Sequence, residues 1–224
     1  MTGLIIALDQ PDLPKAEHLA AQLKHKVSAF KVGLTLFSAY GPEAILEIAQ
    51  HAPVFCDLKL HDIPNQVRFA VAELKRQKVW LATVHASGGS EMVSAAVEAA
   101  EGSPLIAAVT VLTSIDTETL ISVGQGDDPK TQVLLLARLA VDAGVPALVC
   151  SAEEVAAVRA EVGEGIVLVV PGIRPLGEST QDQARVSTPA AASKAGADYL
   201  VVGRPVTEAP DPIAAVERLI EEIA

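Results

Sequence analysis

Three charged side chains follow a hydrophobic run in the segment from Asp57 to Ile63, which reads Asp-Leu-Lys-Leu-His-Asp-Ile. The residues before Asp57 are apolar, and Leu58 and Leu60 alternate with polar positions, which indicates a buried strand. Side chains two apart on a strand share a face, so Asp57 and Lys59 are expected to point the same way. Burying a carboxylate and an ammonium costs on the order of several kcal/mol unless they are paired or used. This segment is therefore a candidate active site.

A further charged residue is expected on the inner face of a neighbouring strand. Lys31 alternates with Phe30 and Val32, which places it on the opposite face. A lone buried lysine would lose its proton or destabilise the fold, so we expect carboxylate partners, and Asp57 and Asp9 are on the neighbouring predicted strands. These charges could instead merely fill the mouth of a barrel. Several such groups on adjacent strand ends favour a functional site.

Short β-rich runs alternate with helical patterns along the whole chain. The β-rich runs cover residues 4–8, 29–32, 54–59, 79–84, 105–111, 147–150, 166–170 and 199–202. The helical patterns cover residues 13–24, 42–50, 64–78, 90–100, 131–143, 152–162, 189–195 and 212–223. This alternation predicts a parallel sheet, and eight units within 224 residues favour a (β/α)8 TIM barrel that forms a single domain over residues 1–224. An open doubly wound sheet is the alternative, because alternation does not establish closure.

The charge balance limits the partners of the chain. Seventeen Lys and Arg residues against 28 Asp and Glu give a net charge of -11, which disfavours binding to nucleic acid. An anionic small molecule must then be captured by a local basic cluster. No apolar run is long enough to span a bilayer, and no basic leader is evident, so we expect no membrane association and a cytoplasmic location. Cys56 and Cys150 each lie in an apolar pattern, which favours two reduced, buried thiols over a disulfide or a metal site.

A phosphate site is expected after the last two strands. There Gly172 is followed by Arg174, and Gly203 by Arg204. The corresponding loops of TIM barrels commonly bind phosphate, because glycine permits close backbone approach and arginine offers a forked donor. Each glycine alone could be an ordinary turn. The polar segment 176–182 is either a lid over this site or a surface loop.

The segment from Asp57 to Asn65 closely resembles the signature of the orotidine 5'-phosphate decarboxylase family. Further segments resemble that family in the same order, from the first strand to the last helix. They are Ala7-Leu8-Asp9, Phe30-Lys31-Val32-Gly33, Thr83-Val84-His85-Ala86, residues 109–114, residues 171–175, Asp182-Gln183, Thr188-Pro189 and residues 201–205. The Asp-x-Lys-x-x-Asp core is shared with sugar-phosphate relatives, whereas His61-Asp62-Ile63-Pro64-Asn65 points to the nucleotide decarboxylase.

The resemblance implies decarboxylation of orotidine 5'-phosphate to UMP and CO2 in pyrimidine biosynthesis. Lys59 would be the catalytic ammonium, with Asp57, Lys31 and Asp62 completing an alternating array of charges. Asp62 would be supplied to the site of the neighbouring subunit, so the resemblance implies a homodimer with sites at the interface. It also implies that no metal and no organic cofactor take part.

The resemblance also assigns substrate contacts outside the charge array. Asp9 would contact the ribose and Thr113 the pyrimidine. The phosphate would be bound by Gln183, Gly203 and Arg204, with Arg174 alongside. Ile63 and Gln66 would also contact the substrate. Many family members carry Thr at the position of Gln66, which leaves its contact with the partner's ribose open.

Two other functions compete with this interpretation. One is a metal-dependent sugar-phosphate lyase of the same superfamily, which would hold a divalent ion at its carboxylates. The other is a catalytically silent protein that binds nucleotides. Metal dependence would distinguish the first, and substitution of Lys59 would distinguish the second.

Overall fold

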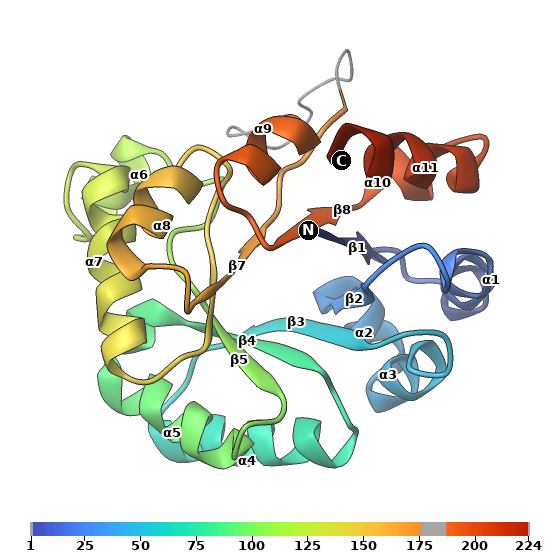
Figure 1. Ribbon diagram of the computed structural model, residues 1–224. Helices are drawn as coiled ribbons and strands as arrows, with labels where there is room; N and C mark the ends of the chain where they lie inside the picture. The colour runs from blue at the N-terminus through green and yellow to red at the C-terminus, as the bar shows by residue number, and fades with distance from the viewer. Residues whose placement is uncertain (1, 176–186, 224) are drawn as a thin grey trace.

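The fold is a closed barrel of parallel strands. A computed structural model of the chain describes residues 2–175 and 187–223. Strands β1 to β8 pair in chain order, and β8 also pairs with β1, so the sheet closes on itself. The helices lie around the outside of the barrel (Figure 1). The predicted (β/α)8 TIM barrel is confirmed, and the open sheet is excluded because its two edge strands are hydrogen-bonded to each other.

Each predicted β-rich run overlaps one strand. The strands are β1 (Gly3–Ala7), β2 (Ala29–Gly33), β3 (Val54–Leu60), β4 (Leu81–His85), β5 (Leu105–Val109), β6 (Ala147–Val149), β7 (Val167–Val170) and β8 (Tyr199–Val202). The bounds of β8 are as predicted, and those of the other strands differ from the prediction by one or two residues.

The helices follow the predicted order, with additional short helices between them. They are α1 (Leu13–Leu23), α2 (Leu34–Tyr40), α3 (Pro42–Ile48), α4 (Pro64–Arg76), the 3₁₀ turn η1 (Ala86–Gly88), α5 (Ser90–Ala100), α6 (Thr117–Ser122), α7 (Pro129–Asp142), α8 (Val155–Val162), α9 (Pro189–Lys194), α10 (Arg204–Thr207) and α11 (Pro212–Ile223). The sequence did not predict α2, α6, α10 or η1. Each is at most two turns long, too short for a hydrophobic period to be recognised. No helix in the described ranges is long and apolar enough to cross a membrane.

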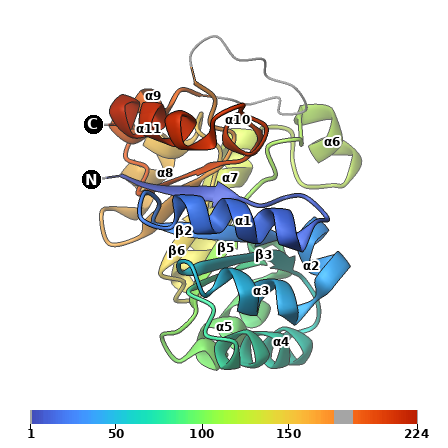
Figure 2. The same ribbon diagram turned by 90° about the vertical axis from the view of Figure 1, so that its right-hand side faces the viewer.

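Two apolar layers result from the alternation along each strand. One face of the strands points into the barrel, where a cluster forms that includes Ile5, Phe55 and Leu81. The other face packs against the helices and contributes, among others, Phe30 and Val32. Helices α1 and α3 lie on the near side of β2 and β3 in the turned view, and α2 lies beside them (Figure 2). On the inner face, Ala29 of β2 is followed by Lys31 and Phe55 of β3 by Asp57, so this face changes from apolar to charged toward the carboxyl end of each strand.

Helix starts are fixed by local capping. The carboxylate of Asp12 accepts a hydrogen bond from the backbone of Lys15 at the start of α1, and Asp128 accepts two from the first turn of α7. Such caps satisfy amide groups that have no partner inside the helix. Several helices begin with proline, which is tolerated in a first turn. These caps fix where the helices begin, just after the loops that surround the barrel mouth.

Candidate active site

A cavity of about 560 Å³ lies at the carboxyl ends of the strands. Its walls come from strands on every side of the barrel except β4, and from the loops that follow them. Phe55 and Val201 belong to both the inner apolar cluster and the cavity wall, so the cluster closes the cavity from below. The polar part of the wall holds Asp9, Lys31 and Asp57. The cavity therefore lies where active sites of TIM barrels are found.

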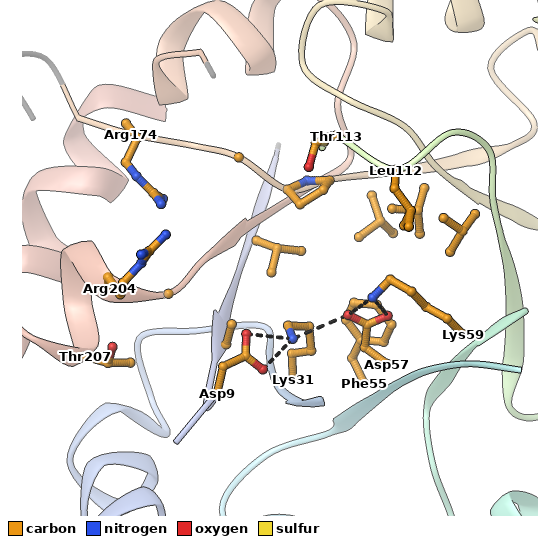
Figure 3. A pocket seen from close by; sticks show the side chains of 18 of the residues that line it. Asp9, Lys31, Phe55, Asp57, Lys59, Leu112, Thr113, Arg174, Arg204 and Thr207 are labelled. Atoms are coloured by element: carbon orange, nitrogen blue, oxygen red, sulfur yellow. Dashed lines mark hydrogen bonds and ion pairs between the residues drawn. The ribbon is translucent and has the colours of Figure 1, made fainter. Parts of the chain in front are cut away.

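Four charged side chains form a continuous array along one side of this cavity (Figure 3). The ammonium of Lys31 donates to both carboxylate oxygens of Asp9, at 2.7 and 2.9 Å, and lies 3.4 Å from Asp57 Oδ2. The ammonium of Lys59 donates to both oxygens of Asp57, each at 2.8 Å. The expectation that Lys31 has Asp9 and Asp57 as partners is confirmed. The order Asp9, Lys31, Asp57, Lys59 alternates in sign.

The array holds its two buried members in their charged forms. Burial alone would lower the pKa of Lys31, but the carboxylates of Asp57 and Asp9 outweigh it and raise the pKa above the ordinary value of 10.5. Burial alone would raise the pKa of Asp57, but Lys31 and Lys59 outweigh it and lower the pKa below 3.8. Opposite charges at hydrogen-bond distance compensate the loss of solvent in this way. Lys31 and Asp57 are therefore a charged pair at neutral pH.

The backbone of β3 is irregular at Lys59. The residue has a positive φ of 52°, which is uncommon for a side chain other than glycine. The register between β3 and β4 shifts between Cys56 and Leu60. The backbone N–H of Lys59 donates to the hydroxyl of Thr83 at 2.8 Å, and that hydroxyl donates to Asp57 Oδ1 at 3.0 Å. The bulge turns the lysine ammonium back toward Asp57.

Glycine at position 33 leaves room for the first pair of the array. A Cβ at Gly33 would lie 2.4 Å from Asp9 Oδ1 and 2.7 Å from Lys31 Nζ. Any other residue would therefore displace this ion pair. Sequence reasoning missed the role of Gly33, although the alternation of β2 places it on the same inner face as Lys31 and so contained the signal.

A basic region lies on the opposite side of the cavity from Lys59 (Figure 3). Arg174 and Arg204 both line the cavity there, together with Gly203. Gly203 immediately precedes α10, which begins at Arg204. Thr113 lines the cavity from the segment after β5. Gln183 and the loop 176–182 were also singled out from the sequence, and they lie outside the described residues.

Three residues singled out from the sequence lie away from the cavity of their own chain. Asp62, Ile63 and Gln66 are exposed, and none is among the described residues that line the cavity. Asp62 Oδ1 accepts a hydrogen bond from the backbone N–H of Ile63 at 2.7 Å. The array within one copy of the chain thus ends at Lys59.

The cavity wall includes polar residues that sequence reasoning did not select. Gln10 and Lys15 line it beside Asp9, and Thr207 lines it beside Arg204. Each lies close in sequence to a residue that was selected. The sequence does not show which of the residues that follow a strand face the cavity. Thr83 was also missed as a partner of the array, because it lies on β4 behind Asp57.

Residues 2–219 match the family model described as the orotidine 5'-phosphate decarboxylase / HUMPS family. The chain belongs to this family. The resemblance drawn from the Asp57–Asn65 segment is thereby confirmed, because the match extends over nearly the whole barrel.

Curated proteins and solved structures agree with membership of the orotidine 5'-phosphate decarboxylase / HUMPS family. The chain is 53% identical over 214 residues to the orotidine 5'-phosphate decarboxylase of Anaeromyxobacter sp. (strain K), which covers 95% of this chain and 94% of that protein. It is 50% identical over 222 residues to the protein of that name from Thermobifida fusca (strain YX), covering 98% and 95% respectively. The crystal structure of orotidine 5'-phosphate decarboxylase from Lactobacillus acidophilus matches with a TM-score of 0.88 at 34% identity, covering 100% of this chain and 99% of that chain.

Proposed function

We propose that the chain decarboxylates orotidine 5'-phosphate to UMP and CO2 in pyrimidine biosynthesis. Membership of the family and relatives of that name at up to 53% identity support this function. The observation that carries it is the array Asp9, Lys31, Asp57 and Lys59 at one side of the cavity, facing two arginines at the other. A nucleotide has its phosphate at one end and its base at the other, so the phosphate would lie at the arginines and the base at the charge array.

Lys59 is the proposed source of catalysis. Loss of CO2 from C6 of the pyrimidine leaves an electron pair in the plane of the ring, which the ring cannot delocalise as an enolate. A fixed ammonium beside that carbon stabilises the developing charge and then donates the proton. The 2.8 Å contacts with Asp57 hold the ammonium in one place before the reaction. A preorganised charge of this kind costs no reorganisation during the step.

Asp57 and Lys31 are proposed to set the field in which Lys59 acts. The ionised Asp57 would also lie near the substrate carboxylate and favour its departure. Lys31 balances the negative charge of Asp57. It also orients Asp9, which we propose binds a ribose hydroxyl. Thr113, on the segment after β5, is proposed to contact the pyrimidine.

The other end of the cavity is proposed to bind the phosphate. Arg174, Arg204 and the backbone at Gly203 would bind it, with Gln183 as a further proposed contact. The basic residues supply the local attraction that a chain of net charge -11 needs for an anionic substrate. Binding energy at the phosphate, away from C6, can be used to assemble the site for the reaction.

We also propose that the active form is a homodimer whose sites are shared. Asp62, Ile63 and Gln66 are exposed in one copy of the chain and would complete the site of the partner. Leu34, Ile63 and Phe69 are apolar and 58%, 64% and 60% exposed. Leu34 and Ile63 follow the neighbouring strands β2 and β3, and Phe69 lies on α4, the helix that begins just after Asp62. A second copy would bury them.

The reaction as proposed requires no metal ion and no organic cofactor. The oxygens of Asp9 and Asp57 accept hydrogen bonds from lysine ammonium groups. The described residues contain no group of three or more His, Cys, Asp or Glu side chains arranged to hold a metal. The metal-dependent lyase finds no support among the named relatives. We propose the cytoplasm as the location, in keeping with two buried free cysteines.

The test is the fall in absorbance of orotidine 5'-phosphate with the purified chain in the presence of EDTA, with UMP identified by chromatography. We expect turnover at the same rate with and without EDTA. A parallel reaction with a keto-sugar phosphate and Mg²⁺ tests the lyase, and calorimetric titration with UMP tests the silent nucleotide-binding protein. Binding of UMP without turnover would overturn the proposed function.

A further inference from the structure

Thr83 contacts the charge array from behind, without lining the cavity. It lies on β4 and is 1% exposed. Its hydroxyl oxygen is 2.8 Å from the backbone nitrogen of Lys59 and 3.0 Å from Asp57 Oδ1. A single buried hydroxyl therefore contacts the main chain of one member of the array and the side chain of the next.

The direction of both hydrogen bonds is fixed by chemistry. A backbone N–H can only donate, so the oxygen of Thr83 accepts from Lys59. An ionised carboxylate can only accept, so the one hydrogen of the hydroxyl points to Asp57. The hydroxyl has no hydrogen left for any other partner, and it is committed to these two groups.

The position matters because the backbone of β3 departs from a regular strand there. Lys59 has a φ of 52°, and the β3–β4 register shifts between Cys56 and Leu60. In a regular ladder, the N–H of Lys59 would donate to a backbone carbonyl of the adjacent strand. Here a side-chain hydroxyl takes the place of that carbonyl. Residues in sparsely populated backbone conformations persist only where their surroundings fix them.

We propose that Thr83 is a positioning residue for the decarboxylation, which holds Lys59 and Asp57 in the geometry that presents the ammonium to the reacting carbon. The inference rests on the proposed function. Lys59 Nζ also contacts Asp57, so the hydroxyl of Thr83 closes a loop through the backbone and the side chain of Lys59. Losing the hydroxyl would release both ends of the loop at once.

A purely structural role for Thr83 predicts a different outcome. Threonine and valine have nearly the same shape, so Thr83→Val keeps the packing of β4 and removes only the hydroxyl. Thr83→Ser keeps the hydroxyl and removes a methyl group. If packing alone were important, the serine variant would be the impaired one and the valine variant would work normally.

The experiment measures kcat and KM for orotidine 5'-phosphate with wild type, Thr83→Val and Thr83→Ser, together with thermal unfolding. Thr110→Val is the matched control, because Thr110 is 3% exposed and its hydroxyl donates to the carbonyl of Val149, away from the array. We expect kcat of Thr83→Val to fall about 10- to 100-fold, with KM changed by less than about threefold, because the lost geometry acts on the reacting step. Thr83→Ser and Thr110→Val should stay within about threefold of the wild-type kcat.

The outcomes separate this inference from the proposed function. A wild-type chain that turns over its substrate, beside a folded Thr83→Val variant of equal kcat, would overturn the role of Thr83 alone. Thr83→Ser that is as impaired as Thr83→Val would also overturn it. A wild-type chain without turnover would overturn the proposed function and this role with it. Should Thr83→Val not fold, Thr83→Cys is the deciding variant, because a thiol forms only weak hydrogen bonds. A folded Thr83→Cys variant with wild-type kcat would contradict the role of Thr83, and a fall in kcat of about tenfold or more would support it.

Discussion

Lys59 Nζ lies 2.8 Å from each carboxylate oxygen of Asp57. The two residues are two apart on β3. In a regular strand their side chains would lie parallel on one face, separated by the length of two residues. The positive φ of Lys59 turns the side chain back, so that the ammonium reaches the carboxylate of Asp57. The local backbone therefore sets the geometry of this ion pair, and variants around it test whether that geometry matters.

Gly33→Ala should separate the other ion pair of the array. Its new Cβ would lie 2.4 Å from Asp9 Oδ1 and 2.7 Å from Lys31 Nζ. We expect kcat/KM for orotidine 5'-phosphate to fall by about tenfold or more, because misplaced catalytic groups lose their orientation. Urea unfolding should show a loss of about 1–3 kcal/mol from overpacking.

The matched control is Gly165→Ala, since a Cβ at Gly165 would meet no atom within 4 Å. It should retain wild-type activity and stability. Wild-type kcat/KM in a folded Gly33→Ala variant would show that the position of the Asp9–Lys31 pair is unimportant for the reaction.

The array should make stability depend on pH at both extremes. Lys31 and Lys59 outweigh burial and lower the pKa of Asp57 below 3.8, so its contribution to stability is present above that pH and is lost as the pH falls through the folded-state pKa. Asp57 and Asp9 outweigh burial and raise the pKa of Lys31 above 10.5, so its contribution is present below that pH and is lost at higher pH. The free energy of unfolding, measured with urea between pH 2 and pH 12, should decline at both ends.

The acid part of this prediction has its own control. Asp57→Asn removes the titrating carboxylate without changing the size of the side chain, so its stability should decline less than that of wild type as the pH falls below about 4. An acid decline of equal size in both proteins would mean that Asp57 is not stabilised in its charged form.

Arg204 is expected to act on the phosphate of the substrate. Arg204→Ala should lower kcat/KM for orotidine 5'-phosphate by about 100-fold or more, because a charge-assisted, forked contact is lost. The same substitution should leave turnover of orotidine, which has no phosphate, within about threefold of wild type. Steady-state kinetics with both substrates measure the two effects.

Arg138→Ala serves as the control for charge, since Arg138 lies on α7 and pairs with Glu161 away from the cavity. It should behave as wild type with both substrates. An equal loss on both substrates in Arg204→Ala would place its effect elsewhere than at the phosphate.

Shared sites predict complementation between inactive chains. Lys59→Ala and Asp62→Ala should each be inactive alone. Mixed heterodimers contain one site with both residues intact, so random exchange should restore about a quarter of wild-type turnover. Native mass spectrometry confirms that heterodimers form. Heterodimers without any turnover would place Lys59 and Asp62 within one subunit's site.

Sequence patterns were sufficient to predict the barrel and the main partners of its charged residues. The alternation of Ala29 to Gly33 placed Lys31 inside the sheet, and the cost of burying it required the carboxylates of Asp9 and Asp57. Both partners are present at hydrogen-bond or ion-pair distance. A buried charge has few alternatives to pairing, so the position of Lys31 was enough to predict both partners.

Other features depend on tertiary structure and were not predictable. The positive φ of Lys59 accompanies a register shift between β3 and β4, and no local sequence signal such as glycine marks it. Thr83 is distant in sequence from the residues that it contacts. The short helix α10, which begins at Arg204, is too short to give a hydrophobic pattern.

If the ammonium of Lys59 carries the reaction, Lys59→Ala should abolish turnover while the cavity still binds nucleotide. The measurement is kcat for orotidine 5'-phosphate, beside calorimetric titration with UMP to show that the cavity is intact. We expect kcat to fall by about 1,000-fold or more, because both charge stabilisation and the proton donor are lost, with the Kd for UMP within about tenfold of wild type. A variant that binds UMP and retains kcat within about tenfold of wild type would show that the reaction does not need the ammonium of Lys59.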